Sequence, residues 1–217
     1  MGSDGARVRI DGTGTPESNM ATDAAMLAAQ ESWIVRLYGW APHGLSLGRF
    51  QRPEDFSDIS GDHRIVRRIT GGGAIYHARE ITFALAYDAD LMRVSLDESY
   101  KIVHLVVRDV LAGFGVRTEL VTEGKGCSAR PRDRWCFATP GRNDLVTPRG
   151  HKIVGSAQRR IRTPRDRVLH HGSLVLETPA QTPFCGAVAE QASVDTVEPV
   201  LTRRLATALA ALFAATP

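Results

Sequence analysis

Cysteine is scarce in this chain, and that scarcity excludes one class of small protein. The 217 residues include only three cysteines, Cys127, Cys136 and Cys185. Three is an odd number, and no two of them have the C-x-x-C spacing of a metal knuckle. Neither a disulfide framework nor a zinc site is therefore expected. We interpret all three cysteines as reduced thiols.

Long apolar runs are missing as well. No segment approaches the roughly 18 apolar residues needed to cross a bilayer, and the most apolar one, near the C-terminus, contains Arg203 and Arg204. The first 17 residues are polar and rich in glycine, without the apolar core of a signal peptide. We expect residues 1–17 to form a flexible tail and the protein to be cytoplasmic, away from membranes.

Aromatic residues make up only 6% of the chain, whereas arginines gather in one part of it. A platform for single-stranded nucleic acid needs aromatic side chains interleaved with basic ones. That pattern is absent, so no nucleic acid partner is expected. The arginine cluster is either a solvated face or a patch that steers an acidic partner. Its members are Arg130, Arg132, Arg134, Arg159, Arg160, Arg162, Arg165 and Arg167.

Length and composition suit a single domain. A hydrophobic content of 43% over 217 residues is enough for one well-buried core. Three helices are predicted: one follows the polar residues 18–19, one begins at a capping box formed by Ser95 and Glu98, and one begins near Pro199. We expect one domain over residues 18–217.

Strand signals fill the segments between these helices. Residues 81–88 alternate large and small apolar side chains, and residues 144–160 read as a hairpin that turns at residues 148–150. Further strands are expected at residues 34–40, 44–50, within 64–77, and at 169–177. Several of the links are short, which favours antiparallel pairing. The predicted fold class is α+β, a mostly antiparallel mixed sheet flanked by helices.

Three consecutive glycines stand in the stretch RRITGGGAIYH, residues 67–77. This stretch is neither the GxxxxGK[ST] phosphate loop nor the GxGxxG dinucleotide loop. Glycine is costly to order, so a triple glycine beside a strand indicates either a flexible turn or a group that approaches the backbone more closely than a Cβ allows.

Three stretches occur in a telling order: RRITGGGAIYH at residues 67–77, GRNDLVTPRGHKIVGSAQRR at residues 141–160, and LHHGSLVLE at residues 169–177. Together they resemble the lipoate-protein ligase and octanoyltransferase family, which shares its catalytic fold with the biotin-protein ligases. NMATDAAML and SLGRFQ resemble the family's first helix and strand, so the resemblance covers about residues 18–178. It implies the biotin/lipoate protein ligase fold, which is similar to class II synthetases.

The resemblance also implies an acyl-binding tunnel in which the bare glycines allow an alkyl chain to lie against the backbone. A linear chain gains roughly 0.8 kcal/mol for each buried CH₂ when the walls fit it. No metal is implied among the binding residues. Those residues correspond here to Arg68, Gly71, Gly72, Gly73, His77, Asn143, Asp144, Gly155, Ser156, Ala157 and His171.

Lys152, in GHKIVGSA, matches the family's functional lysine. An unremarkable surface lysine at a strand edge is the alternative interpretation. The small residues around it, Gly150 and residues 155–157, favour a lysine that reaches into a ligand site. An ammonium there would polarise a carbonyl or hold a phosphate.

Two cysteines compete for the role of nucleophile. Cys136, in WCF, matches the cysteine that accepts the acyl group in transferases of this family, where a nearby ammonium favours the thiolate. Cys185, in PFCGAV, resembles the PCG cysteine of a second transferase type, but only 14 positions separate it from His171. Cys127 has no matching context. Either competing cysteine can instead be a small buried hydrophobe.

The string Gly141-Arg142-Asn143-Asp144 is closer to the ATP-dependent ligases, in which an Asn-Asp pair helps to hold the adenylate and magnesium. Such ligases usually carry an accessory C-terminal domain, whereas about 40 residues follow LHHGSLVLE here. That length favours the transferase, which needs no cofactor. ATP and magnesium are implied only under the ligase alternative.

The preferred hypothesis is an octanoyltransferase that uses Cys136 and Lys152. The implied donor is an acyl-carrier protein, and the implied acceptors are lipoyl domains of 2-oxoacid dehydrogenases or the glycine cleavage H protein. A lipoate-protein ligase acting through acyl-AMP is the alternative. A non-catalytic acyl-binding relative would need neither Lys152 nor a thiol, so the presence of both argues against it.

Overall fold

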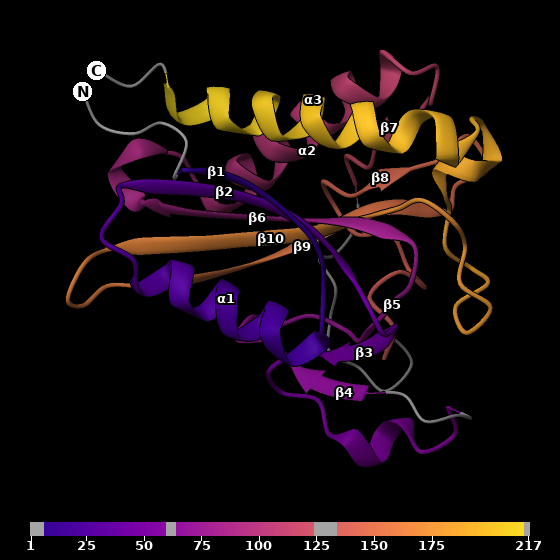
Figure 1. Ribbon diagram of the computed structural model, residues 1–217, viewed down its shortest axis with the longest axis horizontal. Helices are drawn as coiled ribbons and strands as arrows, with labels where there is room; N and C mark the ends of the chain where they lie inside the picture. Colours follow the sequence, from indigo (N-terminus) through magenta and orange to yellow (C-terminus); the bar gives the residue numbers. More distant parts are fainter. Residues whose placement is uncertain (1–6, 60–63, 124–133, 215–217) are drawn as a thin grey trace.

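The computed structural model describes residues 7–59, 64–123 and 134–214. A seven-stranded sheet in the order β1-β2-β6-β10-β9-β8-β7 forms the centre of the fold, and a three-stranded sheet in the order β4-β3-β5 lies beside it (Figure 1). The strands of the large sheet are β1 Val8–Gly14, β2 Trp33–Trp40, β6 Glu80–Asp88, β7 Glu119–Leu120, β8 Leu145–Val146, β9 Lys152–Ile161 and β10 Arg167–Val175. Those of the small sheet are β3 Gly44–Leu47, β4 Arg64–Arg67 and β5 Ile75–His77.

Helices cover both faces of the large sheet. Helix α1, Pro16–Ala28, packs on one face, and helices α2, Leu96–Ala112, and α3, Val194–Ala214, pack on the other (Figure 1). Short 3₁₀ turns occur at Pro53–Phe56, Ala89–Leu91 and Val188–Glu190. Parallel pairing is confined to β1 with β2 and β3 with β4, and every other described strand pair is antiparallel. The predicted α+β class with a mostly antiparallel sheet is confirmed.

Strand β6 shows why the sheet is covered twice. Its large side chains, including Phe83 and Leu85, belong to the core under α2 and α3, whereas Ala84 and Ala86 face α1. Successive residues of a strand point to opposite faces, so the alternation of large and small side chains sets a thick core on one side and a close helix on the other. The strand prediction for residues 81–88 is confirmed.

The first residues of the described chain differ from the prediction. The expected flexible tail over residues 1–17 is wrong for Val8–Gly14, which form β1 and pair with β2 from Val8 opposite Val35 to Gly14 opposite Trp40. The strand is polar because it lies at the sheet edge with its side chains mostly exposed. Helix α1 begins at Pro16, capped by Thr15, whose side chain accepts from the Ser18 N–H at 3.2 Å.

The predicted start of the last helix is also wrong, by five residues. Helix α3 begins at Val194 and contains Pro199 in its interior, where a proline removes one backbone donor. Contacts outside the helix stabilise the extra turn. Val194 is buried, and Asp195 and Glu198 both bind the Arg79 guanidinium.

The capping of α2 is as predicted, since Ser95 accepts from the Glu98 N–H at 3.1 Å.

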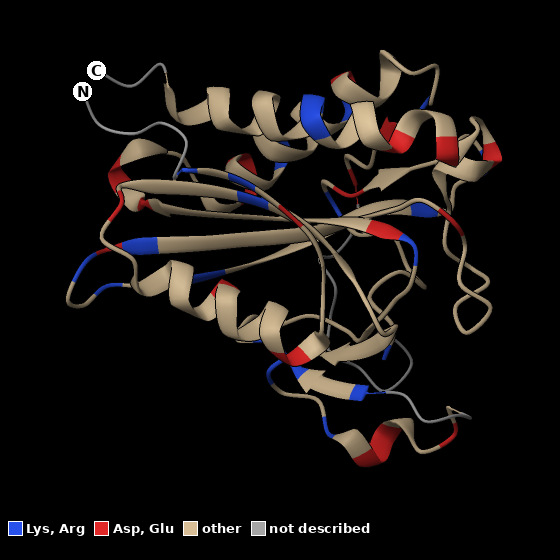
Figure 2. Cartoon of the chain, viewed as in Figure 1, with Lys and Arg blue, Asp and Glu red and all other residues tan. Residues whose placement is uncertain are grey.

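Most described arginines of the sequence cluster are paired with local acids. Arg160 pairs with Asp166, and Arg165 and Arg167 pair with Asp88. Figure 2 shows basic residues close to acidic ones along this part of the chain. Arg130, Arg132 and Cys127 lie outside the described residues.

Among the described helices, none is both long enough and apolar enough to cross a bilayer.

Candidate active site

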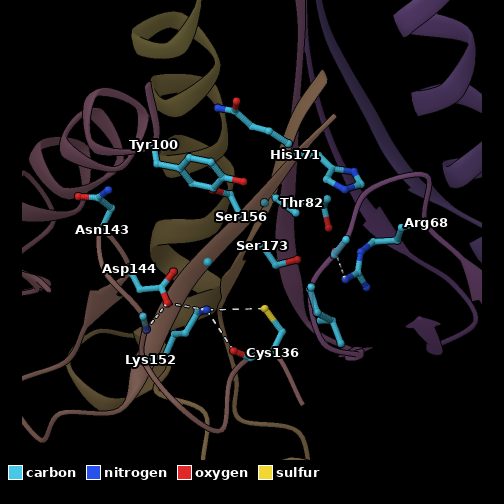
Figure 3. A pocket seen from close by; sticks show the side chains of 18 of the residues that line it. Arg68, Thr82, Tyr100, Cys136, Asn143, Asp144, Lys152, Ser156, His171 and Ser173 are labelled. Atoms are coloured by element: carbon cyan, nitrogen blue, oxygen red, sulfur yellow. Dashed lines mark hydrogen bonds and ion pairs between the residues drawn. The ribbon is translucent and has the colours of Figure 1, made fainter. Parts of the chain in front are cut away.

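A cavity of about 400 Å³ opens between α2, strands β9 and β10, and the loop that joins β4 to β5 (Figure 3). This volume lies in the range of ordinary small-molecule sites. Every residue predicted to be catalytic or acyl-binding lines it except Gly73. Further lining residues, not predicted from the sequence, are Met20, Tyr38, Trp40, Ile75, Thr82, Leu96, Asp97, Tyr100, Gly141, Arg142, Gln158, Gly172 and Ser173.

Lys152 is the most deeply buried cation of the cavity wall. Its side chain is 2% exposed, and its ammonium donates to the Cys136 carbonyl at 3.1 Å and lies 3.6 Å from Cys136 Sγ (Figure 3). The same nitrogen forms an ion pair with Asp144 Oδ2 at 2.7 Å. A buried charge needs such a partner, because desolvation of an isolated ammonium is very costly. One positive charge is thus held beside a thiol.

Gly155 makes room for this lysine. A Cβ at position 155 would lie 2.3 Å from Lys152 Cε and 2.7 Å from Nζ, far inside van der Waals contact. The lysine therefore folds back over its own strand, across the space that the missing side chain leaves. The small residue in GHKIVGSA has a direct steric function.

Gly73 makes room for the segment that carries Cys136. A Cβ there would lie 2.7 Å from the Cys136 backbone nitrogen, so the glycine allows the Cys136 segment to pack against the loop. Two hydrogen bonds fix this contact: Ala74 N–H donates to the Arg134 carbonyl at 2.7 Å, and Cys136 N–H donates to the Ala74 carbonyl at 2.9 Å. Gly71 and Gly72 line the cavity, whereas Gly73 positions the cysteine.

The Asn143-Asp144 pair is tied into the protein. Asp144 Oδ2 accepts from the Gly141 N–H at 2.7 Å as well as from Lys152. Asn143 has a φ of +69°, in the left-handed region, and its amide nitrogen donates to the Asp97 carbonyl at 3.0 Å and carboxylate at 2.8 Å. Both side chains thereby fix a tight turn next to the lysine.

The loop wall of the cavity carries a second buried cation, Arg68, which is 4% exposed. Its guanidinium donates to the Ser46 carbonyl at 2.8 Å and to the Gly73 carbonyl at 2.8 Å. His77 lies close by, with Nδ1 2.8 Å from Glu80 Oε1, and its ring is stacked on Trp40 at 3.7 Å. Burial lowers the pKa of His77, and Glu80 opposes that shift. These contacts make the loop rigid.

His171 occupies the side of the cavity nearest α1. Its Nδ1 lies 2.9 Å from Asp23 Oδ2, and its Nε2 lies 2.7 Å from Thr70 Oγ1. Asp23 is 1% exposed and also accepts from Arg36 and Tyr38, at 3.0 Å and 2.8 Å. The histidine is therefore fixed in orientation, with both ring nitrogens engaged.

Cys185 is buried but stands apart from the cavity. It lines a separate space of only about 10 Å³. Burial raises its pKa to about 11, so the group remains a protonated thiol at neutral pH. The sequence left two cysteines in competition, and the geometry favours Cys136.

Sequence reasoning missed several polar groups around the site: the buried Asp23, Glu80, His104 and His170, and the partly buried Tyr100. A signal was available for Asp23, because it lies on the same helical face as Met20 and Leu27 and interrupts an apolar stripe. Glu80 likewise begins the apolar strand β6. The two histidines give no such signal, since their partners are distant in sequence.

Comparison with known proteins identifies the family of the chain. A family model described as the lipoyl protein ligase A/B catalytic domain matches residues 15–216. Octanoyltransferase LipM of Kyrpidia tusciae is 35% identical over 191 residues, which are 82% of this chain and 68% of that protein. LipM of Bacillus subtilis is 30% identical over 183 residues, which are 76% of this chain and 63% of that protein. The chain thus spans about two thirds of the length of these relatives.

Solved structures show the same fold. A lipoate-protein ligase A with bound ATP gives a TM-score of 0.66 at 19% identity, covering 94% of this chain and 86% of that one. The bipartite lipoate protein ligase of Thermoplasma acidophilum gives 0.65 at 18% identity, covering 94% and 84%. The fold is therefore the catalytic fold of lipoate protein ligases. Within it, the chain belongs to the lipoyl protein ligase A/B catalytic domain family, a family of acyltransferases and ligases. The resemblance inferred from the motifs is confirmed.

Proposed function

We propose that the protein is an octanoyltransferase of protein lipoylation. It takes the acyl group from an acyl-carrier protein onto Cys136 and passes it to a lysine of a lipoyl domain. One observation carries the proposal: the Lys152 ammonium lies 3.6 Å from Cys136 Sγ at the wall of the cavity. The names of the relatives support it, since they are octanoyltransferases.

The first step uses the ammonium twice. An ammonium beside a sulfur stabilises the thiolate, which is the nucleophilic form. The thiolate attacks the carbonyl carbon of the donor thioester, and the carbonyl oxygen becomes an oxyanion that the Lys152 ammonium stabilises. The carbon–sulfur bond to the donor then breaks, and the donor leaves as a thiolate that takes up a proton. The acyl group remains on Cys136 as a thioester.

The second step regenerates the enzyme. A neutral amine of the acceptor lysine attacks the Cys136 thioester, and the same ammonium stabilises the second oxyanion. The carbon–sulfur bond breaks, Cys136 leaves as the thiolate, and the amine loses a proton as the amide forms. Thioester exchange followed by amide formation needs neither ATP nor a metal. We therefore propose that no cofactor is resident.

The partners follow from this chemistry. The donor is an acyl-carrier protein, and the acceptors are lipoyl domains of 2-oxoacid dehydrogenases or the glycine cleavage H protein. These reactions belong to the cytoplasm, which is the proposed location. The cavity beside Cys136 holds the acyl chain, with Gly71 and Gly72 in its wall.

Intact mass spectrometry tests the proposal directly. Incubation with octanoyl-carrier protein should add one octanoyl group to the wild type and to Cys185→Ala, and none to Cys136→Ala. A wild-type protein without an adduct, or an adduct that survives Cys136→Ala, would contradict the assignment. An adduct lost only in Cys185→Ala would move the nucleophile to that cysteine.

A ligase acting through acyl-AMP is the second candidate, favoured by the sequence of the Asn143-Asp144 pair. Both side chains are engaged within the protein, and Asp144 pairs with Lys152. The test is free octanoate with ATP and magnesium: product with release of pyrophosphate, unaffected by Cys136→Ala, would establish the ligase.

A further inference from the structure

A buried chain of hydrogen bonds connects α2 with the turn that holds Asp144. His104, fully buried on α2, donates from Nδ1 to the carbonyl oxygen of Asn143. Its Nε2 lies 2.8 Å from Ser156 Oγ, and that hydroxyl lies 2.7 Å from His170 Nε2. His170 Nδ1 lies 2.7 Å from Gln158 Nε2. Helix α2 and the adjacent strands β9 and β10 thus share one polar network next to the cavity.

Elementary donor and acceptor rules assign every proton in this network. A carbonyl oxygen only accepts, so His104 must carry its hydrogen on Nδ1 and accept on Nε2 from the Ser156 hydroxyl. Ser156 Oγ then accepts from His170 Nε2–H, which leaves His170 Nδ1 to accept from the Gln158 amide. The second hydrogen of that amide goes to Ser99 Oγ at 2.9 Å. One arrangement of neutral histidines satisfies all the groups, and burial lowers the pKa of both rings.

The end of the network reaches the reactive groups in three short steps. His104 binds the carbonyl of Asn143, the next residue is Asp144, and Asp144 binds Lys152 at 2.7 Å. Asn143 is held in a left-handed conformation, which is uncommon for residues other than glycine but more frequent for Asn than for most. Two bonds to one face of α2 maintain it: the Asn143 amide donates to Asp97, and the Asn143 carbonyl accepts from His104.

We propose that His104 is a positioning residue for the acyl transfer. By donating from Nδ1 to the Asn143 carbonyl, it fixes the turn that holds Asp144, and through Asp144 it holds the Lys152 ammonium beside Cys136. The inference rests on the proposed function in that Cys136 is the nucleophile. The described bonds lead from His104 to Asn143 and from Asp144 to Lys152, so the effect is transmitted through Asn143 and Asp144.

A matched pair of substitutions separates positioning from packing. In His104→Asn, the amide nitrogen replaces Nδ1 and can still donate to the Asn143 carbonyl. In His104→Gln, the longer amide replaces Nε2 instead, so the carbonyl loses its donor. Loss of the donor to this buried carbonyl should lower the transfer rate roughly tenfold. The readouts are single-turnover acyl transfer, donor KM, melting temperature, and alkylation of Cys136 by iodoacetamide in a background that carries both Cys127→Ala and Cys185→Ala.

The expected result is a separation of the two variants. His104→Asn keeps transfer within about threefold of the wild type, whereas His104→Gln lowers it roughly tenfold with donor KM unchanged. Alkylation at pH 7 slows in His104→Gln alone. Equal losses in both variants, or losses that follow the melting temperature, would overturn the proposal. Alkylation needs no acyl donor, so it tests the inference separately from the octanoyltransferase activity.

A measurement on the unaltered protein covers the case in which a variant does not fold. Nitrogen-15 chemical shifts of the histidine rings should show the Nδ1–H tautomer for His104 and the Nε2–H tautomer for His170. An Nε2–H tautomer at His104 would contradict the proposal, because Nδ1 would then have no hydrogen to donate to Asn143.

Discussion

Two short segments of this chain each carry a buried cysteine, and they differ in what surrounds the sulfur. Cys136 is 6% exposed and Cys185 is 5% exposed, and both pack in one apolar cluster with Phe137 and Val175. Only Cys136 has an ammonium within 3.6 Å of its sulfur and an open cavity beside it. Burial alone therefore says little about a thiol, and the neighbouring charge and space decide its chemistry.

The Cys185 segment has a supporting function. Gly186 N–H donates to the Lys152 carbonyl at 2.9 Å, and Thr178 Oγ1 donates to the Cys185 carbonyl at 3.1 Å. The first bond anchors the beginning of β9, from which Lys152 extends. One cysteine segment thus faces the cavity, and the other fixes the strand that supplies the cation. Four predictions test this contrast.

The largest effect is expected from exchanging the sulfurs. Cys136→Ser should abolish octanoyl transfer to a lipoyl domain, by at least about 10³-fold, because a hydroxyl is a far weaker nucleophile than a thiolate beside an ammonium. Cys185→Ser should stay within about threefold of the wild type. Steady-state transfer rates measure both. Equal activity of the two variants, or loss only in Cys185→Ser, would remove the proposed distinction.

The second effect concerns the charge beside the sulfur. Lys152→Met should lower transfer by about 10²–10³-fold, as expected when one oxyanion stabiliser is lost. Lys101→Met is the matched control, since Lys101 is half-exposed on α2 and forms an ion pair with Glu98 on the same helix. Its rate should equal that of the wild type. Transfer that survives Lys152→Met would mean that the ammonium is needed only for packing. Melting curves would show whether the substitution unfolds the protein.

Much of this contrast was predictable from the sequence. The spacing of small residues around Lys152 indicated a lysine that enters a ligand site, and the structure adds the reason, which is the contact between Lys152 and the vacant face of Gly155. The glycine run left a flexible turn and a close approach to the backbone as alternatives. At Gly73 the structure shows a close approach, and the group that approaches is the Cys136 backbone.

Other features could not be predicted, for identifiable reasons. Strand β1 is polar and glycine-rich, and it becomes a strand only because β2 offers an edge for pairing. His104 and Asn143 are 39 residues apart, so no local pattern connects them. Sequence patterns report local periodicity, whereas partnerships between distant residues depend on how the strands are ordered.

The third prediction adds a single methyl group in the space that the Lys152 side chain occupies. Gly155→Ala places a Cβ 2.3 Å from Lys152 Cε, so the lysine must leave its place beside Cys136. Transfer should fall by roughly tenfold or more, corresponding to a loss of about 1.4 kcal/mol or more of transition-state stabilisation. An unchanged melting temperature would assign the loss to the displaced lysine rather than to unfolding. A transfer rate equal to that of the wild type would show that the lysine does not need that space.

The smallest effect on activity is expected from Cys185, whose burial instead adds a pH dependence to the stability of the protein. Burial raises its pKa from 9.0 to about 11, so the folded protein favours the protonated thiol. Between these values the unfolded chain loses the proton and the folded chain keeps it. The contribution to stability is therefore complete below pH 9 and is lost as the pH rises through 11. Near pH 10.5, the free energy of unfolding has fallen by about 2 kcal/mol through this group.

Urea unfolding of the wild type and of Cys185→Ala measures the contribution of the Cys185 thiol to the free energy of unfolding. Other groups also titrate in this range, but they are common to both proteins, so the difference between the two isolates the thiol. Between pH 8 and pH 10.5, the wild type should lose about 2 kcal/mol more of its free energy of unfolding than the variant. The variant will be less stable at pH 8 because it lacks the buried sulfur, and the gap should narrow as the pH rises. If the free energies of unfolding of the two proteins change in parallel with pH, Cys185 ionises as easily in the folded protein as in the unfolded chain. The chemical contrast with Cys136 would then rest on the position of Lys152 alone.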